Sequence, residues 1–204
     1  MELDGFWDSI EASRSTAGEH GQEAQIDWLT AYLAATSLEH IRAFHRHWRT
    51  AMDQAYSWDL WGAAYVRTGF CSDDGFEYFR AWLILQGRQN FERAVQDPDC
   101  LGELDPSLDE RPWQSAELAL GITRDAYRRF SGTDAPDGIE ELYELALALH
   151  PRGQIWPTQI EEFQQHWPRL WTRFGQHRDW VTPPQASNQG HPGLSNLVLP
   201  HNMP

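Results

Sequence analysis

The stretch from Phe76 to Leu85 carries apolar or aromatic side chains at nearly every position, so a helix built from it would be apolar on all sides. Such a helix must be enclosed by other elements, because a helix without a polar face is stable only inside a core. The chain holds 20 leucines and 20 alanines but only 4 valines, which favours helices over strands. We therefore predict an all-α fold: a compact multi-helix domain with a C-terminal helical hairpin and an extended tail.

Apolar residues recur at spacings of three and four along most of the chain, which indicates amphipathic helices. Ser37, Asp59 and Asp74 stand at the expected starts of three helices, and each is predicted to cap its helix. Two segments rich in polar, glycine or proline residues, 13–21 and 97–112, are expected to be loops. The predicted helices span about residues 3–12, 22–35, 38–55, 60–67, 75–86, 90–95, 113–130, 139–149 and 157–175.

Composition divides the chain into a helical domain (1–131), a C-terminal helical extension (132–175) and a tail rich in Pro, Gly and Asn (176–204). Pro168 is predicted to kink or split the last helix, because proline lacks the backbone donor of a helix interior. The tail from Pro183 onward has too few apolar residues to offset its ordering and is expected to be dispensable for folding. Four tryptophans are expected to pack the extension onto the domain: Trp156, Trp167, Trp171 and Trp180.

The chain is strongly acidic: 16 arginines and no lysine stand against 30 acids, for a net charge of −14. Such a surface repels phosphate groups, so double-stranded nucleic acid and anionic membranes are excluded as expected partners. Only Cys71 and Cys100 are cysteines, which predicts a reducing, cytoplasmic setting. No apolar run approaches the ~18 residues that a membrane span requires.

Two neighbouring segments, 55–65 and 71–83, combine aromatic and acidic residues in a dense order: AYSWDLWGAAY, then CSDDGFEYFRAWL. With these segments the chain resembles a bacterial family common in actinobacteria, domain-of-unknown-function family 4240, over about residues 1–131. The resemblance implies no activity, ligand or catalytic residue. Its further landmarks are Phe6-Trp7 with Ile10, Gly87-Arg88, Asp97-Pro98-Asp99, Glu117-Leu118 and Ala126-Tyr127.

The acids and the arginine of these segments have two interpretations. Buried charges must be paired or capping, so Arg80 is predicted to close a buried ion pair with Asp59 or Asp73. Alternatively, Asp59, Asp73, Asp74 and Arg80 line one cleft, with His47 as a further member, and perform acid–base catalysis.

Three histidines, His40, His45 and His47, occur within eight residues, but their spacing does not suit a metal site. A pair of helical ligands needs a spacing of three or four residues, as in H-E-x-x-H. Cys71 is predicted to be a small buried apolar residue rather than a nucleophile. No CxxC, GxGxxG or phosphate-loop pattern occurs, and we predict neither a metal nor another cofactor.

Aromatic residues are more numerous around positions 58–82 than a core of this size requires. Such residues fill helical cores, but with a few polar groups they also line ligand pockets. The candidate ligand-binding residues are Trp58, Trp61, Tyr65, Tyr78 and Trp82. The wider aromatic set of this region also includes Phe76 and Phe79.

Three functions remain open at this point. The first is a non-catalytic binding or regulatory module, whose acidic surface engages a basic protein or peptide and whose aromatic centre binds a small ligand. The second is a cofactor-independent enzyme that uses the Asp and Arg residues, for instance in tailoring a peptide or natural product. The third is an immunity or antitoxin-like interaction protein, supported only by the net charge. The sequence leaves the oligomeric state open.

Overall fold

The computed structural model describes residues 1–104, 113–133, 148, 150–155, 159–178 and 180. Within these ranges the chain is helical and forms no strand, apart from one isolated parallel bridge between Ser57 and Arg152. The all-α prediction is confirmed. The predicted helix at 139–149, except for residue 148, and the tail from 181 onward lie outside the described residues, as does Trp156.

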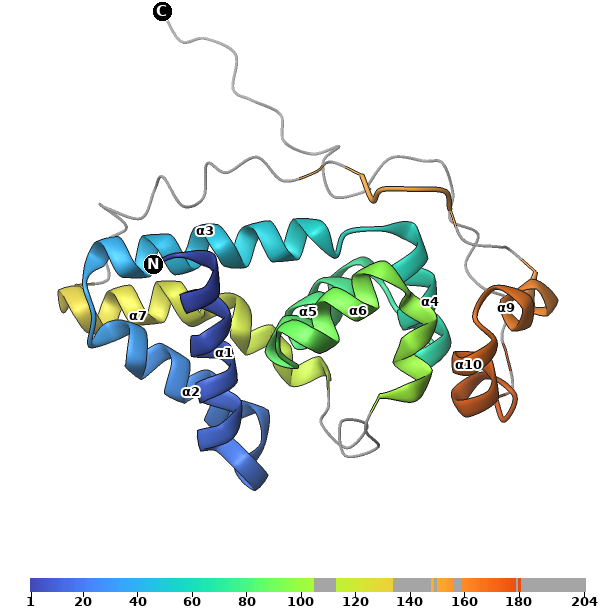
Figure 1. Ribbon diagram of the computed structural model, residues 1–204, viewed down its shortest axis with the longest axis horizontal. Coiled ribbons are helices and arrows are strands. Elements are labelled where there is room, and N and C mark those ends of the chain that lie inside the picture. Colours follow the sequence, from blue (N-terminus) through green and yellow to red (C-terminus); the bar gives the residue numbers. More distant parts are fainter. Residues whose placement is uncertain (105–112, 134–147, 149, 156–158, 179, 181–204) are drawn as a thin grey trace, which may run out of the picture.

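Short connections join the helices of the first 104 residues into one packed body (Figure 1). Three segments are 3₁₀ helices (η1, η2 and η4), and η5 is a single π-helical stretch. The elements are α1 (Leu3–Ala17), η1 (Gly18–His20), α2 (Gly21–Ala34), α3 (Leu38–Gln54), α4 (Trp58–Thr68), α5 (Asp73–Leu85), α6 (Arg88–Gln96), η2 (Pro98–Glu103), η4 (Trp113–Gly121), α7 (Ile122–Ser131), α9 (Ile160–His166), α10 (Pro168–Leu170) and η5 (Trp171–Gly175).

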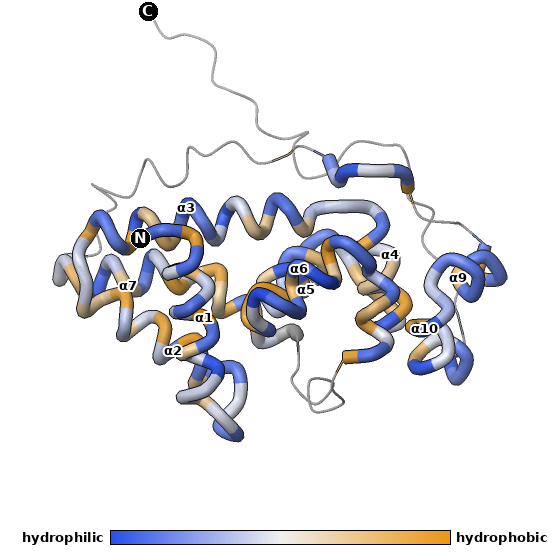
Figure 2. Tube along the Cα trace, viewed as in Figure 1, coloured by the Kyte–Doolittle hydropathy of each residue, from blue (hydrophilic) through white to orange (hydrophobic). Residues whose placement is uncertain are grey.

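Helix α5 is the central element that the sequence predicts. Phe76, Phe79 and the run Trp82–Leu85 are all buried, and Arg80 and Tyr78 are half-buried. The helix contacts α1, α3, α4, α6 and η4, so it is covered on several sides. Its neighbour α3 is amphipathic instead, and hydrophilic residues recur along it between more hydrophobic ones (Figure 2).

Serines cap α3, α4 and α5, although aspartates were predicted as caps for the last two. Ser37 caps α3 as predicted, since its hydroxyl accepts from the His40 amide. The predictions that Asp59 and Asp74 are caps are wrong: Ser57 accepts from the Leu60 amide at 3.2 Å, and Ser72 in the same way caps α5. Both aspartates lie in the first turn, where a carboxylate still stabilises the positive end of the helix dipole.

Of the two predicted loops, 13–21 is helical throughout and 97–112 is helical in part. Helix α1 continues through Ala17, η1 follows it directly and α2 begins at Gly21, and within α1 the Ser13 hydroxyl donates to the Ile10 carbonyl at 2.6 Å. The segment predicted as a loop from 97 begins with η2, and the helix predicted over 113–130 divides into η4 and α7. Gly132, with φ of 69°, ends α7 as expected, and Pro168 begins α10 and so splits the last predicted helix as expected.

The described C-terminal residues pack against one end of the helical body. In Figure 1 they form the orange segment beside α4. Trp167 is buried, and Trp171 and Trp180 are partly buried against the core, as predicted for these three tryptophans. The backbone of Arg152 also contacts the start of α4. The Arg152 amide donates to the Tyr56 carbonyl, and the Trp58 amide donates to the Arg152 carbonyl.

Candidate functional site

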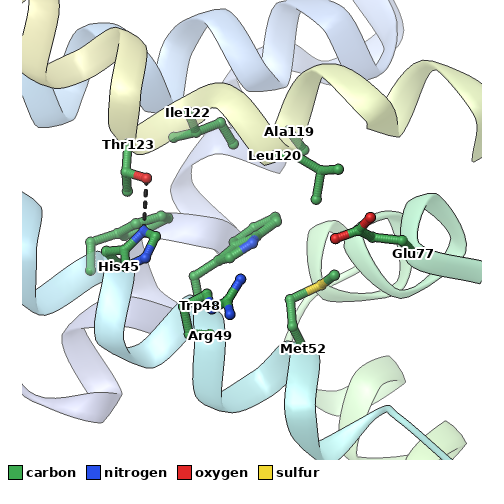
Figure 3. A pocket seen from close by; sticks show the side chains of 10 residues that line it. His45, Trp48, Arg49, Met52, Glu77, Ala119, Leu120, Ile122 and Thr123 are labelled. Carbon is green, nitrogen blue, oxygen red and sulfur yellow. Dashed lines mark hydrogen bonds between the residues drawn. The ribbon is translucent and has the colours of Figure 1, made fainter. Parts of the chain in front are cut away.

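A pocket of about 200 Å³ lies between α3, α5 and the junction of η4 with α7. Its apolar wall includes the buried side chains of Phe44, Trp48 and Met52 from α3. Figure 3 shows α3 and the η4–α7 segment facing each other across the pocket, with Glu77 at one end. The lining residues are Phe44, His45, Trp48, Arg49, Met52, Glu77, Ala119, Leu120, Ile122 and Thr123.

Polar side chains enter this pocket from three elements. His45 is 9% exposed, and its Nδ1 lies 2.9 Å from the Thr123 hydroxyl, so this hydrogen bond joins α3 to α7. A hydroxyl both donates and accepts, so the bond forms with either tautomer of the imidazole. Arg49 and Glu77 are the other two charged or ionisable members of the wall.

Two arginines and two acids share the space between α3 and α5. Burial lowers the pKa of Arg49, whereas the charges of Glu77 and Asp53 raise it. Burial also lowers the pKa of Arg80, and Glu77 contributes the largest opposing effect. Arginine stays protonated at any physiological pH. The Glu77 carboxylate therefore lies in the field of two permanent cations.

Glu77 is half-buried and lines the pocket. Figure 3 shows this carboxylate pointing into the space beside Trp48, Met52 and Leu120. An ionised carboxylate accepts strong, charge-assisted hydrogen bonds from ammonium or guanidinium groups. The pocket thus places the Glu77 carboxylate next to an apolar wall, and the Arg49 side chain belongs to the same lining.

The predicted ion pair of Arg80 with Asp59 or Asp73 is not formed. Arg80 Nη1 instead donates to the Met52 carbonyl at 2.9 Å, and the guanidinium lies 4.5 Å from the ring centre of Tyr56 and 5.2 Å from that of Phe76. The planar, weakly hydrated guanidinium is well suited to stacking between rings. Arg80 is a structural link from α5 to the end of α3.

Replacement of Arg80 should still destabilise the fold. Arg80→Ala removes a charge-assisted hydrogen bond and two cation–π contacts, and we expect the free energy of unfolding to fall by about 2–3 kcal/mol. The control is Arg46→Ala, because Arg46 is exposed and pairs with the exposed Glu39, so the loss of stability should be near zero. Urea denaturation of both variants measures the difference. Equal stabilities would show that Arg80 has no such structural role.

The three candidate acids do not converge on one cleft. Asp59 Oδ1 accepts from Trp167 Nε1 at 2.9 Å and lies 3.0 Å from His166 Nε2, so it holds the C-terminal segment. Asp73 and Asp74 are exposed in the first turn of α5. These placements favour structural roles for the acids over joint acid–base work.

The three histidines of α3 point to different neighbours. His47 Nε2 lies 3.3 Å from the Met1 carbonyl, whereas the His40 ring meets the edge of Tyr32 and His45 contacts Thr123. No group of three His, Cys, Asp or Glu side chains in the described ranges is arranged to hold a metal ion.

The five candidate aromatics are divided between core and surface rather than gathered around one pocket. Trp61, Tyr65 and Trp82 are buried, whereas Trp58 and Tyr78 are half-buried. Trp58 stacks on Trp61 at 5.3 Å between ring centres, and Trp61 Nε1 donates to the Cys71 carbonyl. Tyr65 stacks at 5.7 Å on Trp180. The pocket described above is built mainly by α3, η4 and α7 instead, and Glu77 is its one lining residue from the dense aromatic segments.

Cys71 is a buried thiol, as predicted, and burial raises its pKa from 9.0 to about 12. A pKa raised in the folded state favours the protonated form there. The protonated Cys71 thiol therefore makes its full contribution to the free energy of unfolding below the unfolded pKa near 9. This contribution is lost as the pH rises toward 12.

We expect Cys71 in the native protein to resist alkylation by iodoacetamide at pH 8, because the thiolate is the reactive form. Unfolding in urea should make the thiol reactive within minutes. Peptide mass spectrometry separates Cys71 from Cys100, whose pKa is also raised by burial, to about 11. Rapid labelling of the native thiol at pH 8 would contradict the buried placement.

The sequence did not single out Arg49, Glu77 or Thr123 as site residues, and for His45 it favoured a solvated or hydrogen-bonded histidine over a metal ligand. One signal was visible: His45 and Arg49 are four residues apart, hence on one side of α3, beside the apolar stripe. The contact of His45 with Thr123 joins residues 78 positions apart, and no local pattern predicts it.

The fold and pocket define a class of protein: an all-α domain of closely packed helices, with a small, mixed polar and apolar pocket between its longest helix and α7. Among the described helices none has the length and apolarity needed to cross a membrane. The model of the DUF4240 family, described as a protein of unknown function, matches residues 1–129, and the chain belongs to this family. Neither the curated proteins nor the solved structures include a significant match.

Proposed function

We propose that the family domain is a binding module for a small amphoteric molecule, one with an apolar body, a cationic group and an anionic group. The observation that carries this proposal is the Glu77 carboxylate, which points into a pocket whose lining combines apolar side chains with Arg49. An ammonium group of the ligand would bind Glu77, and a carboxylate of the ligand would bind Arg49. Trp48, Phe44 and Leu120 would contact its apolar body.

The size of the pocket limits the ligand. Drug-sized ligands occupy pockets of about 300–1,000 Å³, whereas an apolar cavity of about 150 Å³ accepts benzene. A pocket of about 200 Å³ therefore suits a molecule with one ring or a short branched chain. An apolar or aromatic α-amino acid combines this size with both charges. The prediction of a basic protein partner stays a prediction.

Isothermal titration of the full chain with phenylalanine, leucine and tryptophan tests the proposal. Two matched probes, phenethylamine and 3-phenylpropionate, each lack one of the charges and should bind at least tenfold more weakly than phenylalanine. Glu77→Gln keeps the shape of the side chain and should also weaken phenylalanine binding at least tenfold. Glu39→Gln, an exposed acid on α3, is the control and should bind as the unmodified protein does. Absence of saturable binding by all three amino acids, or unchanged binding by Glu77→Gln, would refute the proposal.

A further inference from the structure

The described C-terminal segment, residues 159–178 with Trp180, packs on a face of the family domain formed by α4 and η2. Its apolar anchors are Phe163, Trp167 and Leu170, which are 0–1% exposed. The rings of Phe163 and Trp167 meet at 5.6 Å, one helical turn apart. In Figure 1, α9 and α10 lie beside α4 at the end of the molecule opposite α2.

Asp99 is the polar centre of this contact. Its carboxylate accepts from the backbone amides of Arg169 and Leu170 at 2.9–3.1 Å and from Arg169 Nε at 2.8 Å. Asp97 and Glu103, also at or near η2, bind the other guanidinium nitrogens of Arg169. Three acids of the domain thus receive one arginine of the segment, and the hydrogen bonds to Asp99 strongly raise the pKa of that arginine.

Further contacts fix the direction of the segment. Asp59, at the start of α4, accepts from Trp167 Nε1, and Arg178 Nη2 donates to the Arg67 carbonyl at the end of α4, at 2.7 Å. At Gly102 the two backbones nearly touch: a Cβ atom there would lie 2.5 Å from the carbonyl carbon of Arg169. The segment therefore packs on the α4–η2 face with contacts that are specific in both chemistry and shape.

The two sides of this interface differ in origin. The α4–η2 face lies within the residues that the family model matches, 1–129, whereas the segment lies outside them. The interface is composed like that of a bound peptide. It has a few buried aromatic anchors and a central arginine, surrounded by half-exposed polar contacts. The charges are complementary too, because the domain contributes acids and the segment contributes arginines.

We propose that the α4–η2 face is a peptide-docking groove, which the chain's own segment occupies and which also accepts a separate peptide. The peptide it recognises has two aromatic residues four positions apart, the second followed by Pro-Arg-Leu, as in Phe163 to Leu170. Asp99 accepts hydrogen bonds from the backbone amides and the arginine of the peptide, and Asp59 accepts one from its tryptophan. This groove is separate from the pocket at α3 and does not depend on the function proposed for that pocket.

The test uses the whole chain with a specific protease site inserted between residues 134 and 147. After cleavage, residues 148–204 should remain bound during gel filtration. An excess of a fluorescent peptide of residues 148–180 should replace them, with saturable binding measured by anisotropy. Circular dichroism during the exchange reports whether the domain stays folded.

Three variants that should weaken binding and one control show whether the exchange is specific. The peptide with Trp167→Ala or Arg169→Ala should bind at least tenfold more weakly. The cleaved chain with Asp99→Asn should lose affinity to a similar extent, whereas Asp27→Asn, which alters an exposed acid of α2, should not. No exchange over several days, loss of the fold when the fragment leaves, or a folded domain that does not rebind the peptide would each overturn the proposal. Exchange that is equally fast with the altered peptides would do so as well.

Discussion

Asp99→Ala should lower the free energy of unfolding by about 3–5 kcal/mol, as expected when one partner of a buried charged contact is removed. Asp99 is 6% exposed, and its carboxylate serves two backbone amides as well as the Arg169 side chain. Without it, the two amides at the start of α10 lose their acceptor in a buried setting, which costs about 1–3 kcal/mol for each unsatisfied group.

Asp97→Ala is the matched control, because Asp97 pairs with the same arginine but its side chain is 48% exposed. Half-exposed pairs contribute at most about 1 kcal/mol, so this variant should be nearly as stable as the unmodified chain. Chemical denaturation gives both values, and limited proteolysis after α9 shows whether the segment detaches first. Equal losses in the two variants would mean that the amides of α10 do not depend on Asp99.

Trp82→Ala should destabilise the protein by about 3–5 kcal/mol, the usual loss for a large aromatic residue in a core. Trp82 is 1% exposed and packs on Phe79 at 5.2 Å between ring centres. The buried guanidinium of Arg67 lies 5.0 Å from its ring centre, so removal of the indole also takes away a surface against which this cation packs.

Trp82→Phe separates the role of the ring from that of the indole nitrogen. Trp82 Nε1 has no hydrogen-bond partner among the described residues, so phenylalanine removes no such bond and keeps an aromatic face under Arg67. We expect clearly less than half the loss seen with alanine. Thermal and urea denaturation compare the two variants. A phenylalanine variant as unstable as the alanine variant would show that the volume of the indole, rather than its aromatic face, is what matters.

The fold class could be predicted because apolar spacing along a helix is a local property. Helices α3 and α5 are found where the periodicity places them, and Gly132 ends α7 where expected. The caps were predicted less well, since Ser57 and Asp59 are both good capping residues and only the backbone geometry decides between them.

The partners of charged side chains could not be predicted, because they depend on which helices become neighbours. Arg80 was expected to bind an acid, but the carbonyl of Met52 and the ring of Tyr56 are what the packing of α3 on α5 brings to it. The pocket was missed for the same reason: His45 and Glu77 carry no signal of their own until α7 closes over them.

The contact at Gly102 has an evolutionary consequence. Since even a methyl group at this position would overlap the backbone at Arg169, every residue except glycine is incompatible with the docked segment as it lies here. The residue at position 102 can therefore distinguish homologous chains that can carry such a segment from those that cannot. Those with glycine retain the capacity to carry a segment along η2, and those with a larger side chain must leave this face open or cover it by another route. Covariation of position 102 with the presence of a Trp-Pro-Arg-Leu stretch downstream would trace the history of the groove through the family.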